Sequence, residues 1–138
     1  MELPLDIRNA IYEMVGVLSD DVDSVWLLGS RANGTATEIS DWDFLIFSNR
    51  EGLERLKVER DRRIDNIDLL VVFDGENFID PWPEDEESAK SGSLSVWKWR
   101  LKDSKTATYQ IVKYLSDEWF KSGQAITKEL IALKVWPV

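Results

Sequence analysis

Three short and mainly apolar runs constrain the fold of this chain more than any other feature. They are Val25–Leu28, Trp42–Phe47 and Ile64–Phe73, and each is followed by glycine or by polar residues. Apolar runs of this length are typical of strands that are buried on both faces. Before them, apolar residues recur in steps of three and four over residues 5–18, which predicts an amphipathic helix. The alternation predicts an α/β or α+β sheet that is covered by helices.

The segments between these runs are polar. Ser30–Ser40 is small and contains glycine, so we expect a loop with room for one helical turn. Ser48 and Asn49 are suited to cap a helix over Glu51–Arg63. Asp80–Ser93 contains two prolines, four consecutive acids and Ser-Gly-Ser, which predicts a mobile surface loop.

The C-terminal third has a less distinct pattern. Ser93–Leu101 places Trp97 and Trp99 on one face of a predicted half-buried strand. After a turn at Lys102–Lys105, Thr106–Leu115 is rich in strand-forming residues and predicts the other half of a hairpin, with a helix as the alternative. The remaining expectations are a helix that begins at Ser116–Glu118 and ends at Gly123, and a final helix over Ile126–Val135.

A length of 138 residues predicts a single domain. Within it we expect a core at residues 1–79, a linker loop at 80–93 and a β-rich C-terminal extension at 94–138. The first residues show no export signal, and no apolar run is long enough to span a bilayer. We therefore expect a cytoplasmic protein with no membrane partner.

Composition excludes several kinds of chemistry. The chain has no cysteine and no histidine, which rules out thiolate nucleophiles, disulfides, imidazole bases and imidazole-bound metals. Catalysis would have to use carboxylates, lysine, arginine or hydroxyl groups, and carboxylate oxygens suit Mg²⁺ or Mn²⁺. A net charge of −9 argues against long duplex nucleic acid as the main partner. It does not argue against a single nucleotide bound with its metal.

Gly29 and Ser30 directly follow the first predicted strand. A glycine there lets a phosphate approach the backbone, and a helical turn after it would offer N–H groups to that phosphate. The Ser30 hydroxyl and the Arg31 guanidinium could add hydrogen bonds. Strand–Gly–Ser turns are common, so the dipeptide alone favours an ordinary turn.

Acidic residues interrupt two of the predicted strands. Asp41 and Asp43 open the second strand on one face, where two carboxylates can share a divalent cation. Asp68 lies inside the third strand, where an unpaired acid is costly, and Asp65 is the alternative candidate for its role. The simpler explanation for Asp68 is a salt bridge with Arg62 or Arg63. The chain also has a control pattern, Asp21-Val22-Asp23, in a connection that we interpret as solvated loop.

Together these residues resemble a known family. Gly29-Ser30-Arg31-Ala32-Asn33-Gly34 followed by Ser40-Asp41-Trp42-Asp43-Phe44 is similar to the signature of nucleotidyltransferases related to DNA polymerase β, and most similar to their minimal single-domain members. The resemblance covers about residues 5–75. Two departures are Trp42, which is bulkier than the usual aliphatic residue, and Phe44 in place of leucine.

The resemblance implies an α+β nucleotidyltransferase fold, with a mixed central sheet and helices packed on one side. It also implies roles for individual residues. Gly29 and Ser30 would hold the triphosphate of a nucleotide, with ATP the expected one. Asp41 and Asp43 would bind two Mg²⁺ ions, and Asp68 would complete the metal site. The implied activity is transfer of a nucleoside monophosphate to an unidentified hydroxyl acceptor on a protein, a nucleic-acid end or a small molecule.

Two other functions stay open. One is a non-catalytic, antitoxin-like protein that binds a toxin or another protein partner. The other is a small-molecule resistance nucleotidyltransferase, which usually needs a second domain to hold its acceptor.

Overall fold

The computed structural model describes residues 2–85, 90–113 and 126–138. Its helices are α1 (Leu5–Leu18), α2 (Gly29–Asn33), α3 (Arg50–Lys57) and α4 (Leu94–Trp97), with single 3₁₀ turns at Ser19–Asp21 and Arg60–Arg62. Its strands are β1 (Ser24–Leu28), β2 (Trp42–Phe47), β3 (Ile67–Val72), β4 (Asn77–Ile79), β5 (Ser91–Ser93), β6 (Arg100–Leu101), β7 (Thr106–Lys113) and β8 (Ile126–Trp136).

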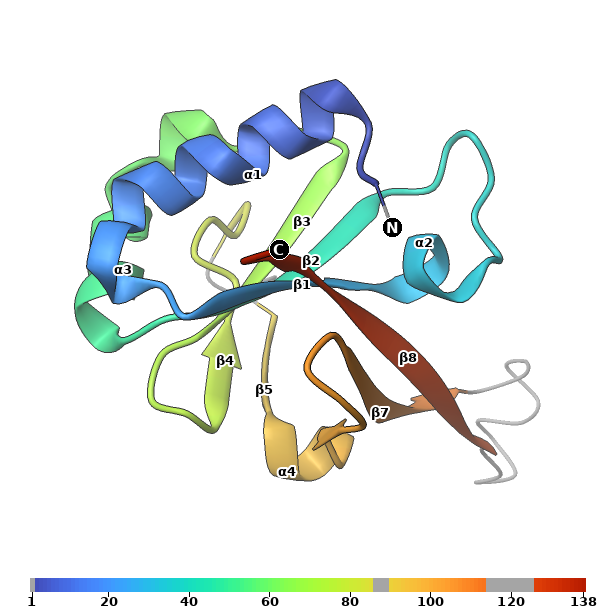
Figure 1. Ribbon diagram of the computed structural model, residues 1–138. Helices are drawn as coiled ribbons and strands as arrows, with labels where there is room; N and C mark the ends of the chain where they lie inside the picture. The colour runs from blue at the N-terminus through green and yellow to red at the C-terminus, as the bar shows by residue number, and fades with distance from the viewer. Residues whose placement is uncertain (1, 86–89, 114–125) are drawn as a thin grey trace.

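The strands described here form one mixed sheet in the order β5-β4-β3-β2-β1-β8-β7-β6 (Figure 1). Strands β2 and β3 run parallel, while the other neighbouring strands pair antiparallel. Because β8 pairs with both β1 and β7, the C-terminal strands extend the central sheet directly. The predicted α+β class and mixed sheet are therefore confirmed.

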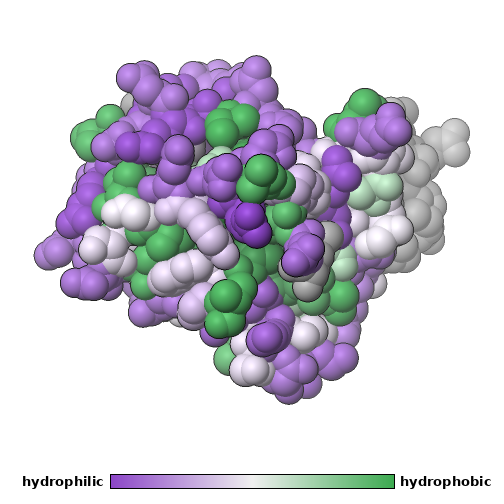
Figure 2. All heavy atoms as spheres, turned by 45° about the horizontal axis from the view of Figure 1, so that its top comes forward, coloured by the Kyte–Doolittle hydropathy of each residue, from purple (hydrophilic) through white to green (hydrophobic). Residues whose placement is uncertain are grey.

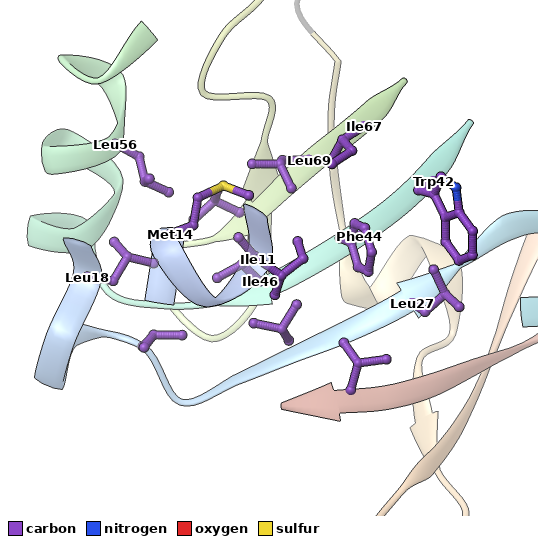
Figure 3. Close-up of a cluster of buried hydrophobic side chains, with 14 of the residues drawn as sticks. Ile11, Met14, Leu18, Leu27, Trp42, Phe44, Ile46, Leu56, Ile67 and Leu69 are labelled. Atoms are coloured by element: carbon purple, nitrogen blue, oxygen red, sulfur yellow. The ribbon is translucent and has the colours of Figure 1, made fainter. Parts of the chain in front are cut away.

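Helices α1 and α3 cover one face of the sheet (Figure 1). Ile11, Met14 and Leu18 of α1 and Leu56 of α3 point toward Phe44 and other apolar side chains of the strands (Figure 3). Each fully buried side chain of this size stabilises the fold by about 1.5–3 kcal/mol relative to its exposed state. The outward side of the molecule in this region is largely hydrophilic, with apolar residues between (Figure 2).

The opposite face carries a second, more aromatic core. It joins Trp26 of β1 and Tyr109 of β7 with Trp97 and Trp99, and the one-turn helix α4 packs here through Leu94. Trp26 and Trp99 meet edge to face at 5.3 Å between ring centroids. Strands β1 and β2 are thus buried on both faces, as their apolar runs predict. Helices also occur on both sides, because α4 lies away from α1 and α3.

Two predicted polar segments differ from the structure. The helix expected over Glu51–Arg63 ends at Lys57: the apolar side chain that follows Leu56 in this segment, Val58, is exposed and does not pack against α1. A mobile loop was expected over Asp80–Ser93, but its first described part is held in place: the buried Trp82 donates its indole N–H to the Leu56 carbonyl at 2.6 Å. Its last residues form β5 against β4.

The C-terminal third contains the largest errors of prediction. Ser93–Leu101 is not one strand, since Ser93 caps the helical turn of α4 and Lys98 takes a positive φ of 54°. Ile126–Val135 is not a helix but part of β8, whose pairing with strands on both sides overrides a weak local helical pattern. The hairpin partner at Thr106 is confirmed as β7. The predicted helix from Ser116 to Gly123 lies outside the described residues.

Within the described ranges, none of the helices has both the length and the apolar character that a bilayer crossing requires.

Candidate active site

Asp43 and Asp68 lie side by side at the start of two neighbouring strands. They are register partners in the parallel pair β2–β3, so their side chains share one face of the sheet. Both are half-buried. That face also carries Leu45, Trp26 and the other residues of the aromatic core.

The proximity of these acids changes the protonation of Asp43. Three causes together raise the pKa of Asp43 from an ordinary 3.8 to about 6: burial, which is the largest, the negative charge of Asp68 and a hydrogen bond with the Asp68 side chain. Lys90 opposes the shift, and Asp41 adds a smaller repulsion. Asp43 and Asp68 therefore form a carboxylate pair whose mutual repulsion is only partly offset by the positive charge of Lys90.

Gly29 brings a backbone turn against this pair. Leu28 pairs with Asp43 across β1–β2, so the chain turns beside the Asp43 carboxylate. Gly29 has a φ of 66°, which side chains rarely allow. A Cβ at this position would collide with Oδ2 of Asp43. The glycine is thus required both by its conformation and by the carboxylate beside it.

Both polar backbone groups of Gly29 have partners. Its N–H donates to the Tyr109 hydroxyl at 2.9 Å, and its carbonyl accepts from Asn33 Nδ2 at 2.8 Å. Asn33 also exchanges two hydrogen bonds with the backbone of Ile131 in β8. Strands β7 and β8 therefore hold the turn. The N–H of Gly29 is therefore engaged within the protein. The Ser30 carbonyl accepts from the N–H groups of Gly34 and Thr35, which closes α2.

The Arg31 side chain contacts residues on either side of Asp41. Its Nη2 donates to the Ser40 carbonyl at 2.8 Å, and the guanidinium lies 4.5 Å from the centroid of the Trp42 ring. These contacts direct the charge away from Gly29. The structure thus shows Arg31 stabilising the 34–41 loop, and it explains why a bulky Trp42 stands between the two acids of the motif.

The third predicted carboxylate, Asp41, is exposed. Among the described residues, no group of three or more acids is placed to hold a metal ion. The structure thus brings Asp43 and Asp68 together and leaves Asp41 at the edge, close enough for its charge to reach Asp43. The donor chemistry of the pair still fits Mg²⁺, because carboxylate oxygens are its preferred protein ligands and a divalent cation would offset the repulsion.

Two alternatives from the sequence are not supported. Arg62 pairs with Glu13 and Glu59, and Arg63 with Asp65 and Glu84, so the described residues provide no ion pair for Asp68. Asp65, the other candidate for the third acid, is fully exposed and faces Arg63 at 3.7 Å.

A pocket of about 260 Å³ opens beside Asp68, on the side away from Gly29. Arg63, Asp80, Glu84 and Lys90 line it together with Asp68. Sequence reasoning missed Lys90, although it is the single basic residue in the acidic stretch 80–93. It also missed Tyr109, for which the sequence offers no signal, because 80 residues separate it from Gly29.

A comparison against known families assigns the chain to a family. The model of the nucleotidyltransferase domain family matches residues 7–126. The chain belongs to this nucleotidyltransferase domain family. The match runs well beyond residue 75, where the resemblance read from the sequence ended, and includes α4 and β7. Neither curated proteins nor solved structures give a match.

Proposed function

We propose that this protein transfers a nucleoside monophosphate from a nucleoside triphosphate to a hydroxyl acceptor, with Mg²⁺ bound at the carboxylates. Membership of the nucleotidyltransferase family supports nucleotidyl transfer as the general chemistry. The observation that carries the proposal is the Asp43–Asp68 pair, which lies against Gly29 and raises the pKa of Asp43 to about 6. Acids whose repulsion is only partly offset cost stability and are typical of functional sites.

The residues on the Gly29 side would bind the nucleotide. The turn presents a backbone without a Cβ, so a triphosphate can approach the carboxylate pair closely. Ser30 would donate its hydroxyl to a phosphate oxygen. We assign Arg31 to support of the 34–41 loop, because its guanidinium already contacts Ser40 and Trp42.

Asp43 and Asp68, with Asp41 reaching in from its loop, would hold the Mg²⁺. When bound, the cation would supply charge neutralisation on the triphosphate and lower the pKa of the acceptor hydroxyl. In the reaction, the acceptor oxygen attacks the α-phosphorus and the bond to the bridging oxygen breaks. Pyrophosphate leaves, and Asp68 takes the hydroxyl proton.

The pocket beside Asp68 is the proposed place of the acceptor. It adjoins the carboxylate that would take the proton, and it lies on the opposite side of the acid pair from the turn. Its lining carries both signs of charge, with Arg63 and Lys90 facing Asp80 and Glu84. A pocket of this size would admit the hydroxyl-bearing end of an acceptor.

Labelled nucleotides test this function. We would incubate the protein with each α-³²P-labelled nucleoside triphosphate, Mg²⁺ and a cell lysate, and measure both the labelled product and the released pyrophosphate. Wild type and Asp21→Asn should label the same acceptor, and Asp43→Asn should not. Equal labelling by wild type and Asp43→Asn would reject the site.

One observation favours a non-catalytic binding protein instead: the described residues contain no ready group of three acids. In that case neither label transfer nor pyrophosphate release would exceed the signal of a protein-free control with any nucleotide.

A further inference from the structure

The C-terminal strands reach the proposed nucleotide site through Tyr109. We propose that Tyr109 is a positioning residue whose hydroxyl fixes the Gly29 peptide, so that the Gly29-Ser30 turn is set for the nucleotide before the nucleotide arrives. The contact that carries this inference is the hydrogen bond from the Gly29 N–H to the Tyr109 hydroxyl, at 2.9 Å. The inference rests on the proposed function and adds to it a role for β7.

The Tyr109 ring is held firmly. Its side chain is buried, with 3% of the residue exposed. The ring stacks on Trp97 at 5.1 Å and on Trp99 at 6.3 Å between centroids. Aromatic packing of this kind fixes a ring in one orientation. The hydroxyl oxygen is therefore a fixed acceptor and not a mobile side-chain tip.

The peptide that Tyr109 holds is the one on which the site depends. Gly29 takes a left-handed conformation, and its Cα lies directly beside the Asp43 carboxylate. A rotation of this peptide would move the turn relative to the carboxylate and redirect Ser30. The second contact of Gly29, from Asn33, is tied to Ile131 of β8. Both polar groups of Gly29 thus depend on the β7–β8 hairpin.

Removal of the hydroxyl alone should loosen this arrangement. In Tyr109→Phe the ring keeps its contacts with the tryptophans, while the Gly29 N–H loses its acceptor. The turn would then sample other conformations, and binding of the nucleotide would have to restore the correct one. A cost of this kind appears in the affinity for the nucleotide, because a disordered site binds less tightly than a preorganised one. The chemical step, which takes place after the turn has been restored, should be little affected.

The opposite model is that the hydrogen bond between Tyr109 and Gly29 weakens nucleotide binding. If a phosphate oxygen needs the N–H of Gly29, the Tyr109 hydroxyl would compete with the nucleotide. Tyr109→Phe would then bind the nucleotide more tightly than wild type. The two effects differ in direction, so one titration separates them.

The experiment compares wild type, Tyr109→Phe and the control Tyr12→Phe, which loses an equivalent hydroxyl from a partly exposed residue of α1. We would measure the Kd of ATP with Mg²⁺, and the KM and kcat of nucleotidyl transfer. Tyr109→Phe should raise Kd and KM roughly three- to tenfold, as expected for one lost hydrogen bond, with kcat within about twofold. Tyr12→Phe should match wild type. An unchanged or lower Kd for Tyr109→Phe would overturn the inference.

A measurement on the wild type keeps the test decisive even if Tyr109→Phe fails to fold. Hydrogen exchange of the Gly29 amide, followed by NMR, should be slow without nucleotide and unchanged by ATP with Mg²⁺, because the turn is already set. Fast exchange without nucleotide, or faster exchange on binding, would contradict preorganisation. If wild type binds no ATP, the proposed function itself fails. If wild type binds and Tyr109→Phe binds equally, only the role of Tyr109 is rejected.

Discussion

Two Asp-x-Asp patterns in this chain have opposite surroundings. At Asp21-Val22-Asp23, the Asp21 carboxylate lies 3.0 Å from Arg55 and accepts a hydrogen bond from Asn49. At Asp41-Trp42-Asp43, the Asp43 carboxylate faces Asp68 and is half-buried beside Gly29. Asp21 thus contacts a guanidinium and a side-chain amide, whereas Asp43 lies beside another carboxylate. An Asp-x-Asp pattern alone therefore predicts no function. What distinguishes Asp43 is its neighbour on the adjacent strand, Asp68.

The largest expected difference between the two patterns concerns activity. Asp43→Asn should lower nucleotidyl transfer by about 100-fold or more, because loss of even an outer partner of a metal site commonly costs 10–100-fold. Asp21→Asn should stay within about twofold of wild type, since its partners are Arg55 of α3 and Asn49, the N-cap of that helix. Initial rates with saturating ATP and Mg²⁺ make the comparison. Equal losses in the two variants would remove the distinction.

The next largest difference concerns stability and its dependence on pH. The pKa of Asp43 is about 6 in the folded protein and 3.8 as the ordinary value. The folded state thus holds its proton more tightly, and this group lowers the stability of the protein as pH rises from about 4 to about 6. Above pH 6, without metal, Asp43→Asn should stabilise the fold by about 1–2 kcal/mol after allowance for solvent screening. Denaturant unfolding of both proteins at pH 4 and pH 8 measures this.

At pH 4 the two proteins should be almost equally stable, since Asp43 is then protonated in the fold. A variant that is less stable than wild type at pH 8 would show that Asp43 makes a stabilising contact.

The smallest expected effect comes from the control pattern. Asp21→Asn should lower stability by about 0.2–1 kcal/mol, the usual range for a partly exposed ion pair. Arg55→Gln should have a similar effect, and the double variant should cost less than the sum of the two. Unfolding in low salt and in 1 M salt would check the ionic origin, because salt screens the pair. Strict additivity of the two substitutions would exclude coupling between them.

The sequence was a good guide where apolar patterns were strong. The α1 helix, the β1 and β2 strands and the carboxylates in β2 and β3 were all located from the periodicity of apolar residues and the position of acids within apolar runs. The sequence could not show whether Asp41 would join the other two acids, because its loop is directed by the contacts of Arg31 with Ser40 and Trp42.

The contribution of the C-terminal strands was beyond the reach of local patterns. β8 is a strand because β1 and β7 pair with it, and Tyr109 reaches Gly29 only through that pairing. Neither the strand pairing of β8 nor the contact between Tyr109 and Gly29 can be predicted from a short stretch of sequence. Trp82 was likewise hidden in a segment whose prolines and acids favour a surface loop, and its burial depends on a carbonyl of α3.

The most direct test of the account is whether Asp43 and its neighbours bind a nucleotide together with a divalent cation. Thermal unfolding should be measured for wild type, Asp43→Ala and Asp21→Ala with Mg²⁺, with ATP, with both and with neither. For wild type, both ligands together should stabilise the fold by about 2.7 kcal/mol at a hundredfold excess over Kd, and either one alone by much less. Asp21→Ala should keep this joint effect and Asp43→Ala should lose it. A wild type that no combination stabilises, or an Asp43→Ala variant with the full joint effect, would contradict the account.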